Sequence, residues 1–175
     1  DYGVWASRHK RPFQYPYAES DSLGVPKVLG QYVLAAPYND IDITASLIRQ
    51  HKDELAAVIV EPLQYIVSPK PGFLKGLRDV TNEEGIPLIF DEIVTGFRLA
   101  WGGAQEFFGV VPDMACLGKI IGGGYPIGAV VGKEEMFYAV TPQAAESSSH
   151  VMFSGTYSGN PISTAAGVAT LKVLQ

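Results

Sequence analysis

Two short apolar runs separated by a helical pattern constrain the fold of this chain more than any other feature. Residues 56–60 and 87–90 are continuously apolar, which is typical of parallel strands covered on both faces. The helical face between them is formed by Phe73, Leu77 and Val80, and Gly85 stands where a left-handed cap would close the helix. A strand, a helix and a strand in this order predict a right-handed crossover and a parallel sheet, so the predicted fold class is α/β.

Weaker patterns predict the other elements. Residues 31–35 indicate a further strand and residues 127–131 another, while Asn39-Asp40 is a cap for a helix that runs up to Glu54. Asn160-Pro161 opens a last helix, with Asn as the cap and Pro in the first turn. The predicted core consists of Val58, Ile59, Leu77, Leu88, Ile89, Val130 and Leu171.

The composition indicates a folded protein and excludes several kinds of partner. With 47% hydrophobic and 18% charged residues, the 175-residue chain lies far from disordered compositions. Its net charge of -5 offers no basic surplus to neutralise phosphates, so we expect no nucleic-acid partner. No apolar run reaches the ~18 residues of a membrane span, and we expect no membrane association. The single cysteine, Cys116, excludes an internal disulfide and favours a reducing, cytoplasmic location.

Carboxylates follow both strands of the predicted parallel pair. Glu61 ends the first strand and Asp91 ends the second. In open parallel sheets ligands bind beyond the carboxyl ends of the strands, so these two acids are expected on one rim. Strand-end acids also cap helices or stay solvated, and position alone does not decide between these interpretations.

Lys119 lies among small and apolar residues, in the stretch 117–124 (Leu-Gly-Lys-Ile-Ile-Gly-Gly-Gly). Such a setting favours the neutral amine that Schiff-base chemistry requires, although lysine is more often a surface residue. The stretch is not a P-loop, because Asp113 and Ile120 stand where that motif needs Gly and Ser or Thr. It is not a dinucleotide fingerprint either, since Pro126 interrupts the required helix.

Other candidate groups carry weaker signals. The loop 154–159 brings hydroxyls and free backbone donors to the start of the last helix, which suits a phosphate, although an ordinary capping loop is the alternative. The histidines show no metal-ligand spacing and are expected to be structural or solvated; they are His9, His51 and His150. Cys116 is expected in the core rather than as a nucleophile. Arg98 suits either a substrate carboxylate or a salt bridge on a helix face.

The motifs occur together in a familiar order. They are Glu61-Pro62, residues 90–98, residues 102–106, residues 108–113, residues 117–124 and residues 155–161 (Gly-Thr-Tyr-Ser-Gly-Asn-Pro). From about Val28 to the end, the chain resembles the class III aminotransferases, which use pyridoxal phosphate (PLP) on the fold-type I scaffold. The resemblance implies that residues 1–175 are part of the PLP-binding large domain, with a mostly parallel sheet flanked by helices. An N-terminal segment and a C-terminal small domain would then lie outside this chain.

The resemblance also implies a set of cofactor contacts within one subunit. Lys119 is similar to the lysine that holds PLP as a Schiff base and then moves a proton on the substrate carbon. Asp91 is similar to the partner of the pyridinium nitrogen, which makes the ring an electron sink. Ile93 would lie against one face of the ring, and Glu61 would belong to the same cofactor-binding set.

A further part of the resemblance concerns a second subunit. Gly155 and Thr156 are similar to residues that bind the cofactor phosphate, with Thr156 reaching it from the neighbouring subunit. The resemblance therefore implies a homodimer.

The expected reaction is an amino-group transfer on a small amino-acid-like substrate. Val94 and Arg98 are similar to the branch that converts glutamate-1-semialdehyde to 5-aminolevulinate, with Arg98 as a candidate for substrate binding. A transaminase that uses a keto-acid acceptor is the first alternative. A nucleotide-binding α/β module that uses the Thr156 loop and a folded but inactive fragment are the others.

Overall fold

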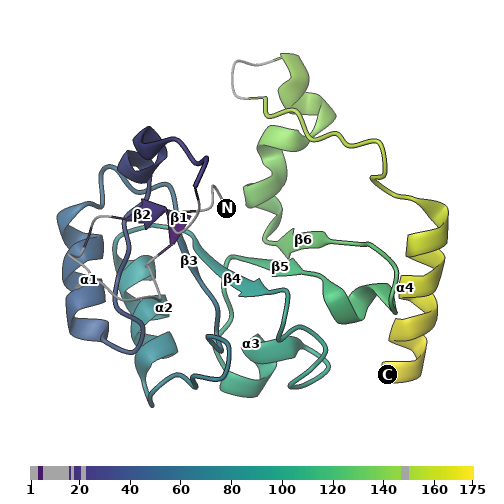
Figure 1. Ribbon diagram of the computed structural model, residues 1–175, viewed down its shortest axis with the longest axis horizontal. Coiled ribbons are helices and arrows are strands. Elements are labelled where there is room, and N and C mark those ends of the chain that lie inside the picture. The colour runs from purple at the N-terminus through teal and green to yellow at the C-terminus, as the bar shows by residue number, and fades with distance from the viewer. Residues whose placement is uncertain (1–3, 6–15, 17, 21–22, 147–149) are drawn as a thin grey trace. The chain divides into compact units, whose positions relative to one another are not determined.

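The computed structural model describes residues 4–5, 16, 18–20, 23–146 and 150–175 (Figure 1). The chain divides into two compact units, residues 1–54 and residues 55–175. All the predicted site residues belong to the second unit, whereas His9 lies outside the described residues. None of the helices in the described ranges is both long and apolar enough to cross a membrane.

The described residues of the first unit form a two-stranded ribbon and two helices. Strands β1 (Val4–Trp5) and β2 (Glu19–Ser20) pair antiparallel. The helix expected after Asn39-Asp40 is α1 (Ile41–Gln50), and the Asp40 carboxylate accepts a hydrogen bond from Ile43 N–H at 3.1 Å. Because residues 51–54 form a turn, α1 ends before the predicted boundary at Glu54.

The strand predicted at residues 31–35 is wrong. Residues 27–32 form the 3₁₀ helix η1 (Lys27–Tyr32), which follows Pro26. A side chain at Gly30 would come within 2.7 Å of the carbonyl oxygen of Ala18, so the turn lies directly against that backbone. This close approach is a tertiary contact that the local apolar pattern does not reveal.

The second unit is built on a four-stranded sheet in the order β3-β4-β5-β6. Its strands are β3 (Val58–Val60), β4 (Leu88–Glu92), β5 (Met114–Leu117) and β6 (Ala129–Gly132). The first three run parallel, and β6 pairs antiparallel with β5. The sheet therefore has the mostly parallel α/β organisation that the sequence predicts.

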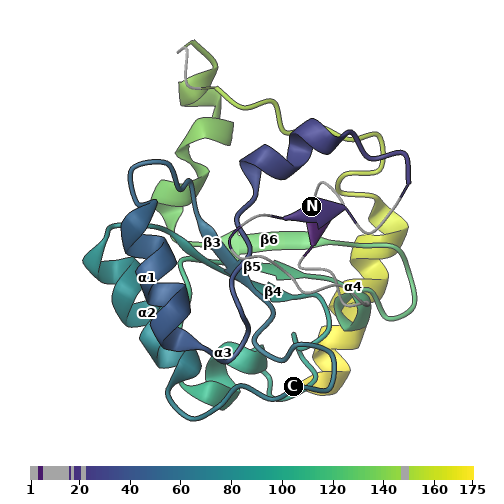
Figure 2. The same cartoon turned by 60° about the vertical axis from the view of Figure 1, so that its left-hand side comes forward.

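Helices connect and cover these strands. The α-helices are α2 (Phe73–Glu83), α3 (Gly103–Phe108) and α4 (Pro161–Leu174), and the 3₁₀ helices are η2 (Lys119–Gly122), η3 (Glu134–Val140) and η4 (Pro142–Glu146). Gly85 closes α2 with a φ of 68°, and the Asn160 side chain caps α4, both as predicted. In both views α2 and α3 lie on one side of the sheet (Figure 2).

The core lies on the face of the sheet that α2 covers. Along β4 the side chains of Leu88, Phe90 and Glu92 are fully buried, whereas Ile89 and Asp91 on the opposite face are only partly buried. Burial of the predicted core residues Leu77 and Leu88 is confirmed. The other predicted core residues in β3, β4, β6 and α4 are half-buried or exposed.

Two of the predicted core residues are exposed. Ile59 is 63% exposed and Val130 is 44% exposed. They lie on β3 and β6, which are the outer strands of this sheet and have a paired strand on one side only. The three remaining residues are half-buried; they are Val58, Ile89 and Leu171. The continuously apolar strands predicted that both faces of the sheet would be covered, whereas the described residues cover only one face.

A buried ion cluster joins four elements at the amino edge of the parallel strands. The Asp113 carboxylate accepts hydrogen bonds from Leu88 N–H and from Arg78 of α2, both at 2.8 Å. Lys133, after β6, approaches the same carboxylate to 2.7 Å. Burial of the carboxyl opposes ionisation, but these hydrogen bonds outweigh it and lower the pKa of Asp113 from 3.8 to about 2.

We expect the Asp113 cluster to stabilise the fold above about pH 4 and to lose this effect as the pH falls towards 2, because the folded pKa is below the unfolded one. The shift corresponds to about 2 kcal/mol. Asp113→Asn should lower the free energy of unfolding by about 3 kcal/mol at neutral pH, because the mostly buried Arg78 loses its charged partner, while the exposed Lys133 contributes less. Denaturant titrations of both proteins between about pH 2 and pH 7 measure this difference.

Asp79→Asn is the matched control, since Asp79 forms an exposed pair with Lys75 of the same helix. This substitution should lower the free energy of unfolding by less than about 1 kcal/mol. A constant difference between wild type and Asp113→Asn across the whole pH range would contradict the role given to Asp113.

Candidate active site

The ends of three parallel strands bring the predicted chemical groups to one edge of the sheet. Val60, the last residue of β3, is in register with Phe90 of β4. The residues that follow them, Glu61 and Asp91, therefore occupy equivalent positions along the two strands. Glu92 is in register with Leu117, which is the last residue of β5, and Lys119 follows two residues later. Glu61, Asp91 and Lys119 therefore belong to the same carboxyl edge, where ligands of open α/β sheets bind.

Asp91 lies on the half-open face of β4. Its Oδ1 atom accepts a hydrogen bond from Ile93 N–H at 3.1 Å. No donor from the described residues reaches Oδ2, so this oxygen is available to a ligand. The residue in register on β5 is Cys116, and burial together with the negative charge of Asp91 raises the pKa of its thiol. A thiol held neutral is a poor nucleophile, which agrees with the interpretation that Cys116 is not catalytic.

Lys119 begins η2 in an uncommon backbone conformation. Its φ is 49°, in the left-handed region that non-glycine residues rarely adopt and that costs of the order of 1–3 kcal/mol. A Cβ atom at the preceding Gly118 would come within 2.9 Å of Ile93 Cδ1, so the Ile93 side chain covers Gly118 directly beside the lysine. Local strain of this kind is typical of functional positions.

The enclosed setting expected for Lys119 is not formed by the described chain. The side chain of Lys119 is exposed, although Gly118 before it and Gly122 after it are buried. The glycines of this stretch instead allow close backbone packing. Gly123 lies against the side chain of Thr170, and a side chain at Gly167 would come within 2.9 Å of the Ile121 carbonyl oxygen. The small residues thus let η2 pack directly on α4.

The loop with Gly155 and Thr156 precedes α4 and is exposed along its length. A turn joins Ser158 N–H to the Gly155 carbonyl at 3.0 Å, and Asn160 then accepts hydrogen bonds from the first N–H groups of α4. Hydroxyls therefore lie before a helix N-terminus, as expected. Within the described ranges, no hydrogen bond links this loop to the edge that carries Lys119 and Asp91.

Arg98 is exposed in the turn-rich segment 93–102, so the expected alternative of a salt bridge on a helix face is wrong. Its Nε donates a hydrogen bond to the Val94 carbonyl at 2.8 Å. This contact folds the side chain back onto its own loop. The histidines described are His51, 3.6 Å from Glu54, and the exposed His150. Among the described residues, no group of three or more His, Cys, Asp or Glu could hold a metal ion.

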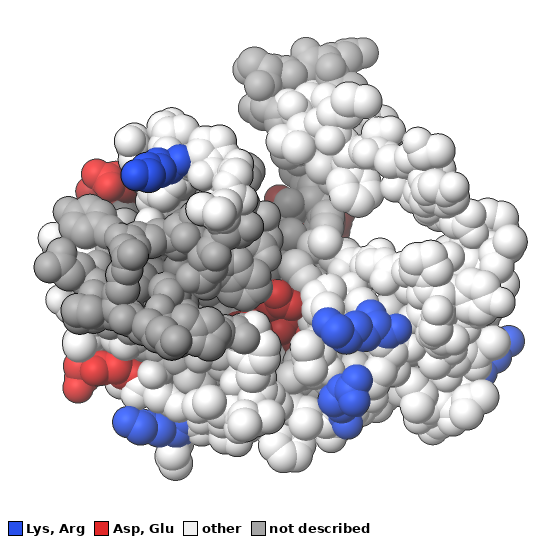
Figure 3. All heavy atoms as spheres, in the orientation of Figure 1, with Lys and Arg blue, Asp and Glu red and all other residues white. Residues whose placement is uncertain are grey.

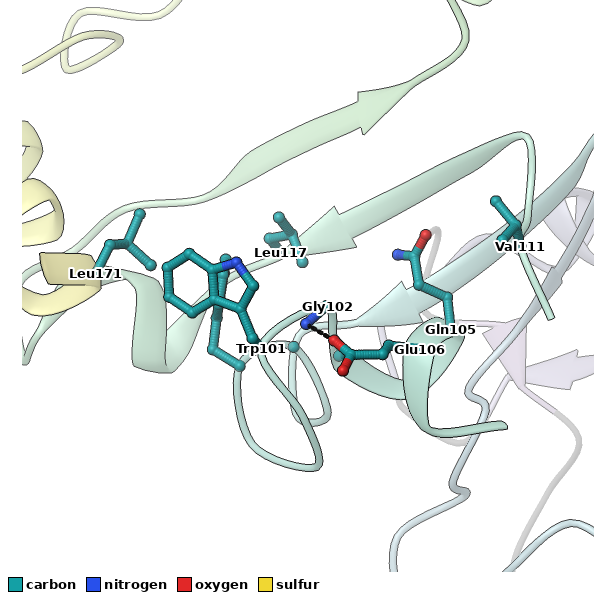
Figure 4. Close-up of a pocket in the computed structure, with 10 residues that line it drawn as sticks. Trp101, Gly102, Gln105, Glu106, Val111, Leu117 and Leu171 are labelled. Atoms are coloured by element: carbon teal, nitrogen blue, oxygen red, sulfur yellow. Dashed lines mark hydrogen bonds between the residues drawn. The ribbon is translucent and has the colours of Figure 1, made fainter. Parts of the chain in front are cut away.

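A pocket of about 510 Å³ lies elsewhere, between α3, β5 and α4 (Figure 4). Trp101, Leu117 and Leu171 supply much of its apolar lining, and Glu106 bonds the backbone N–H of Gly102 beside it. Leu117 follows Cys116 on β5, so its side chain points to the face opposite Asp91. The pocket contains none of the predicted site residues.

The sequence analysis missed Glu92 as a candidate functional residue. Its carboxylate is fully buried and accepts four hydrogen bonds, from Thr95, Ala104 and Gln105. Period-two alternation from Leu88 through Phe90 places Glu92 on the buried face, and this signal was available in the sequence. It was overlooked because Asp91-Glu92 was interpreted as the end of the strand rather than its last two residues.

Among the described residues on the face shown in Figure 3, Lys and Arg side chains occur in small separate groups. Comparison with known families then identifies the chain. The family described as aminotransferase class-III matches residues 8–175. The chain belongs to the class III aminotransferases. This result agrees with the order of motifs between Glu61 and Pro161.

Individual class III relatives are similar over most of the chain. Glutamate-1-semialdehyde 2,1-aminomutase of Methanosarcina acetivorans is 51% identical over 160 residues, which is 90% of this chain and 37% of that protein. The protein of the same name from Methanocaldococcus jannaschii is 49% identical over 161 residues, again 90% of this chain and 37% of the relative. The class III chain described here therefore spans little more than a third of these curated relatives.

Solved structures show the same fold. An omega-transaminase from Sphaerobacter thermophilus is 40% identical with a TM-score of 0.84, over 92% of this chain and 37% of that one. A transaminase with PLP bound is 28% identical with a TM-score of 0.83, over 94% of this chain and 38% of that one. The α/β arrangement of this class III chain is thus that of PLP-dependent transaminases.

Proposed function

We propose that the chain is part of the PLP-binding large domain of an enzyme that transfers amino groups. The observation that carries this proposal is the common edge of Asp91 and Lys119, with Ile93 packed beside the lysine. Membership of the class III family and similarity to a PLP-bound transaminase support it. Further segments of the whole protein, on either side of residues 1–175, would complete the domain. The single cysteine supports a cytoplasmic location.

The chemical groups at this edge fit PLP. Oδ2 of Asp91 has no donor among the described residues and can bind a protonated ring nitrogen, while the Lys119 amine is exposed and accessible to an aldehyde. Ile93 offers an alkyl surface on the same side. When bound, PLP supplies an electron sink for negative charge that develops on the substrate carbon.

Each residue then has a defined task. Lys119 would hold the cofactor covalently through Nζ, and its amine would take up and return the proton at the substrate carbon. Asp91 keeps the ring nitrogen protonated, because a carboxylate next to a cationic nitrogen favours its charged form. Ile93 would offer an alkyl surface to the cofactor beside Lys119, and Glu61, directly after β3, would complete the edge.

The cofactor phosphate is bound by Gly155 and Thr156 in our proposal. The loop that contains them is exposed, bears hydroxyls and precedes the capped N-terminus of α4. Because no hydrogen bond among the described residues links it to the Lys119 edge, we propose that it serves the active site of a second copy. The active unit is then a homodimer in which Thr156 crosses the interface.

Mixed dimers test the assignment of Thr156. Lys119→Ala and Thr156→Val chains are each expected to have little activity, but their heterodimer places both lesions in one site and leaves the other intact. Unfolding and refolding the two chains together should restore part of the activity, up to about half of the wild-type value per heterodimer.

The control mixes Lys119→Ala with Asp91→Asn, two residues proposed to act in the same subunit. Each site of that heterodimer carries one lesion, so no activity should return. Failure of the Thr156→Val mixture to recover, with heterodimers verified by mass, would show that Thr156 serves its own subunit.

The reaction that we propose is the conversion of glutamate-1-semialdehyde to 5-aminolevulinate, and it is supported by similarity to relatives named glutamate-1-semialdehyde 2,1-aminomutase. Val94 is exposed on the segment that follows Asp91, and Arg98 is bound to its carbonyl. We propose Arg98 as a contact for a substrate carboxylate, reached when the side chain leaves Val94. A transaminase with a keto-acid acceptor is the second candidate, favoured by the similarity to an omega-transaminase.

Substrate tests on the full-length holoenzyme separate these two reactions. With glutamate-1-semialdehyde as the only substrate, 5-aminolevulinate should accumulate over many turnovers, because a mutase returns the amino group to the same carbon skeleton. Lys119→Ala is the control and should form none. A strict requirement for pyruvate or 2-oxoglutarate would contradict the mutase proposal and establish the transaminase.

A further inference from the structure

Glu92 is a buried acid that the proposed chemistry does not use. Its side chain is fully buried at the end of β4. A buried carboxylate is costly unless hydrogen bonds replace its hydration. Oε2 accepts from Thr95 Oγ1 at 2.9 Å and from Ala104 N–H at 2.6 Å. Oε1 accepts from the backbone N–H and the side-chain amide of Gln105, at 3.3 and 3.1 Å. All four partners are donors, which suits the ionised carboxylate.

These donors come from both ends of the segment that joins β4 to α3. Thr95 lies three residues after Glu92, whereas Ala104 and Gln105 belong to the first turn of α3. The N-cap residue of α3 is Gly102, which has no side chain with which to cap the helix. Glu92 takes over that task from the neighbouring strand.

The glycines of the segment make this arrangement possible. A Cβ atom at Gly103, whose φ is 73°, would collide with the Glu92 carboxylate. A Cβ atom at Gly96 would come within 2.8 Å of the Glu92 carbonyl oxygen, which also accepts the Gly96 N–H. The segment 93–102 therefore closes tightly around Glu92, and its backbone has little freedom to rotate.

Asp91 and Glu92 are consecutive residues of one strand and point to opposite faces of the sheet. Fixing Glu92 on the buried face therefore fixes the direction of Asp91 on the open face. The burial of Glu92 also fixes Ile93, whose N–H donates a hydrogen bond to Oδ1 of Asp91. Oδ2 of Asp91 then remains available to a ligand. The geometry points to Glu92 as the positioning residue for the Asp91 carboxylate, an inference that rests on the proposed role of Asp91 towards PLP.

Glu92→Gln tests this inference in the full-length holoenzyme. The substitution keeps the volume but turns one acceptor oxygen into an amide that faces donors, so two of the four hydrogen bonds are lost. We expect the variant to fold and to bind PLP, with a misdirected Asp91. Misplacement of a catalytic group by about 1 Å can cost about 100-fold in rate, so kcat should fall by about 10- to 100-fold, with KM changed by less than about threefold.

The readout that a purely structural role would not change is the protonation of the cofactor ring. PLP labelled with ¹⁵N at the ring nitrogen reports this in the NMR spectrum of the resting enzyme, independently of turnover. Wild type should show a protonated nitrogen at neutral pH, and Glu92→Gln should show a partly deprotonated one. Circular dichroism and the amount of PLP bound per subunit establish that the compared proteins are folded and loaded.

Glu106→Gln is the matched control. Glu106 also accepts a backbone N–H of this segment, from Gly102, but it shares none of the donors that bind Glu92. This variant should keep the wild-type ¹⁵N shift and kcat. If Glu92→Gln does not fold, Gln105→Ala removes one side-chain donor from the same carboxylate and should produce the same changes in smaller measure.

Asp91→Asn separates failure of the inference from failure of the proposed function. In one outcome, Asp91→Asn loses the protonated ring nitrogen, whereas folded Glu92→Gln or Gln105→Ala keeps it and has a kcat within about twofold of wild type. The inference about Glu92 is then wrong, and the proposed role of Asp91 stands. If Asp91→Asn itself keeps a protonated nitrogen and a normal kcat, the proposed role of Asp91 is wrong, and the inference falls with it.

Discussion

The parallel pairing of β3, β4 and β5 is the constraint on which the rest of the structure depends. Their hydrogen-bonded register brings residues from three separate parts of the sequence to one edge, without any direct bond between the side chains concerned. Glu61 and Lys119 lie 58 positions apart in the sequence, yet each follows the end of its strand. A shift in the pairing of β3 with β4 would displace Glu61 from Asp91, and a shift in the pairing of β4 with β5 would displace Lys119 from Asp91.

The two faces of β4 have different tasks. Leu88, Phe90 and Glu92 face α2 and α3, where they are fully buried and hold the strand in place. Asp91 faces the half-open side, where one of its oxygens has no donor within the part of the chain that the structure describes. Rigidity on one face would thus support the proposed role of Asp91 on the other. The ion cluster around Asp113 holds the opposite edge of the same strands.

The sequence predicted those elements whose signals are local. The caps Asp40 and Asn160, the left-handed Gly85 and the strand pair around α2 follow from side-chain chemistry or from periodicity within a few residues. Residues 114–117 were missed as β5 although Met-Ala-Cys-Leu is a continuously apolar run like those of β3 and β6. Residues 103–108 were missed as α3 because six residues are too few to show a helical period.

What the sequence did not predict depends on contacts between distant segments. The 3₁₀ helix η1 takes up the first two residues of an expected strand, and Gly30 within it lies on the backbone of Ala18. Ile59 and Val130 are exposed because they lie on the half-open face of the sheet, in register with Ile89 and Cys116, and the described chain does not cover that face. At the candidate site, sequence motifs predicted Glu61, Asp91 and Lys119. Only the structure revealed the four hydrogen-bond donors around Glu92 and the strained φ of Lys119.

The most direct test of the account is to locate the residue that binds PLP covalently. Borohydride reduction of the full-length holoenzyme, followed by peptide mapping, should place one pyridoxyl group on Lys119, and Lys119→Ala should retain no label. Lys70 and Lys133 are internal controls, because both belong to the same unit as Lys119 and neither begins the strained turn after β5. A pyridoxyl group on either of them, or undiminished labelling of Lys119→Ala, would contradict the assignment of the carboxyl edge as the PLP site.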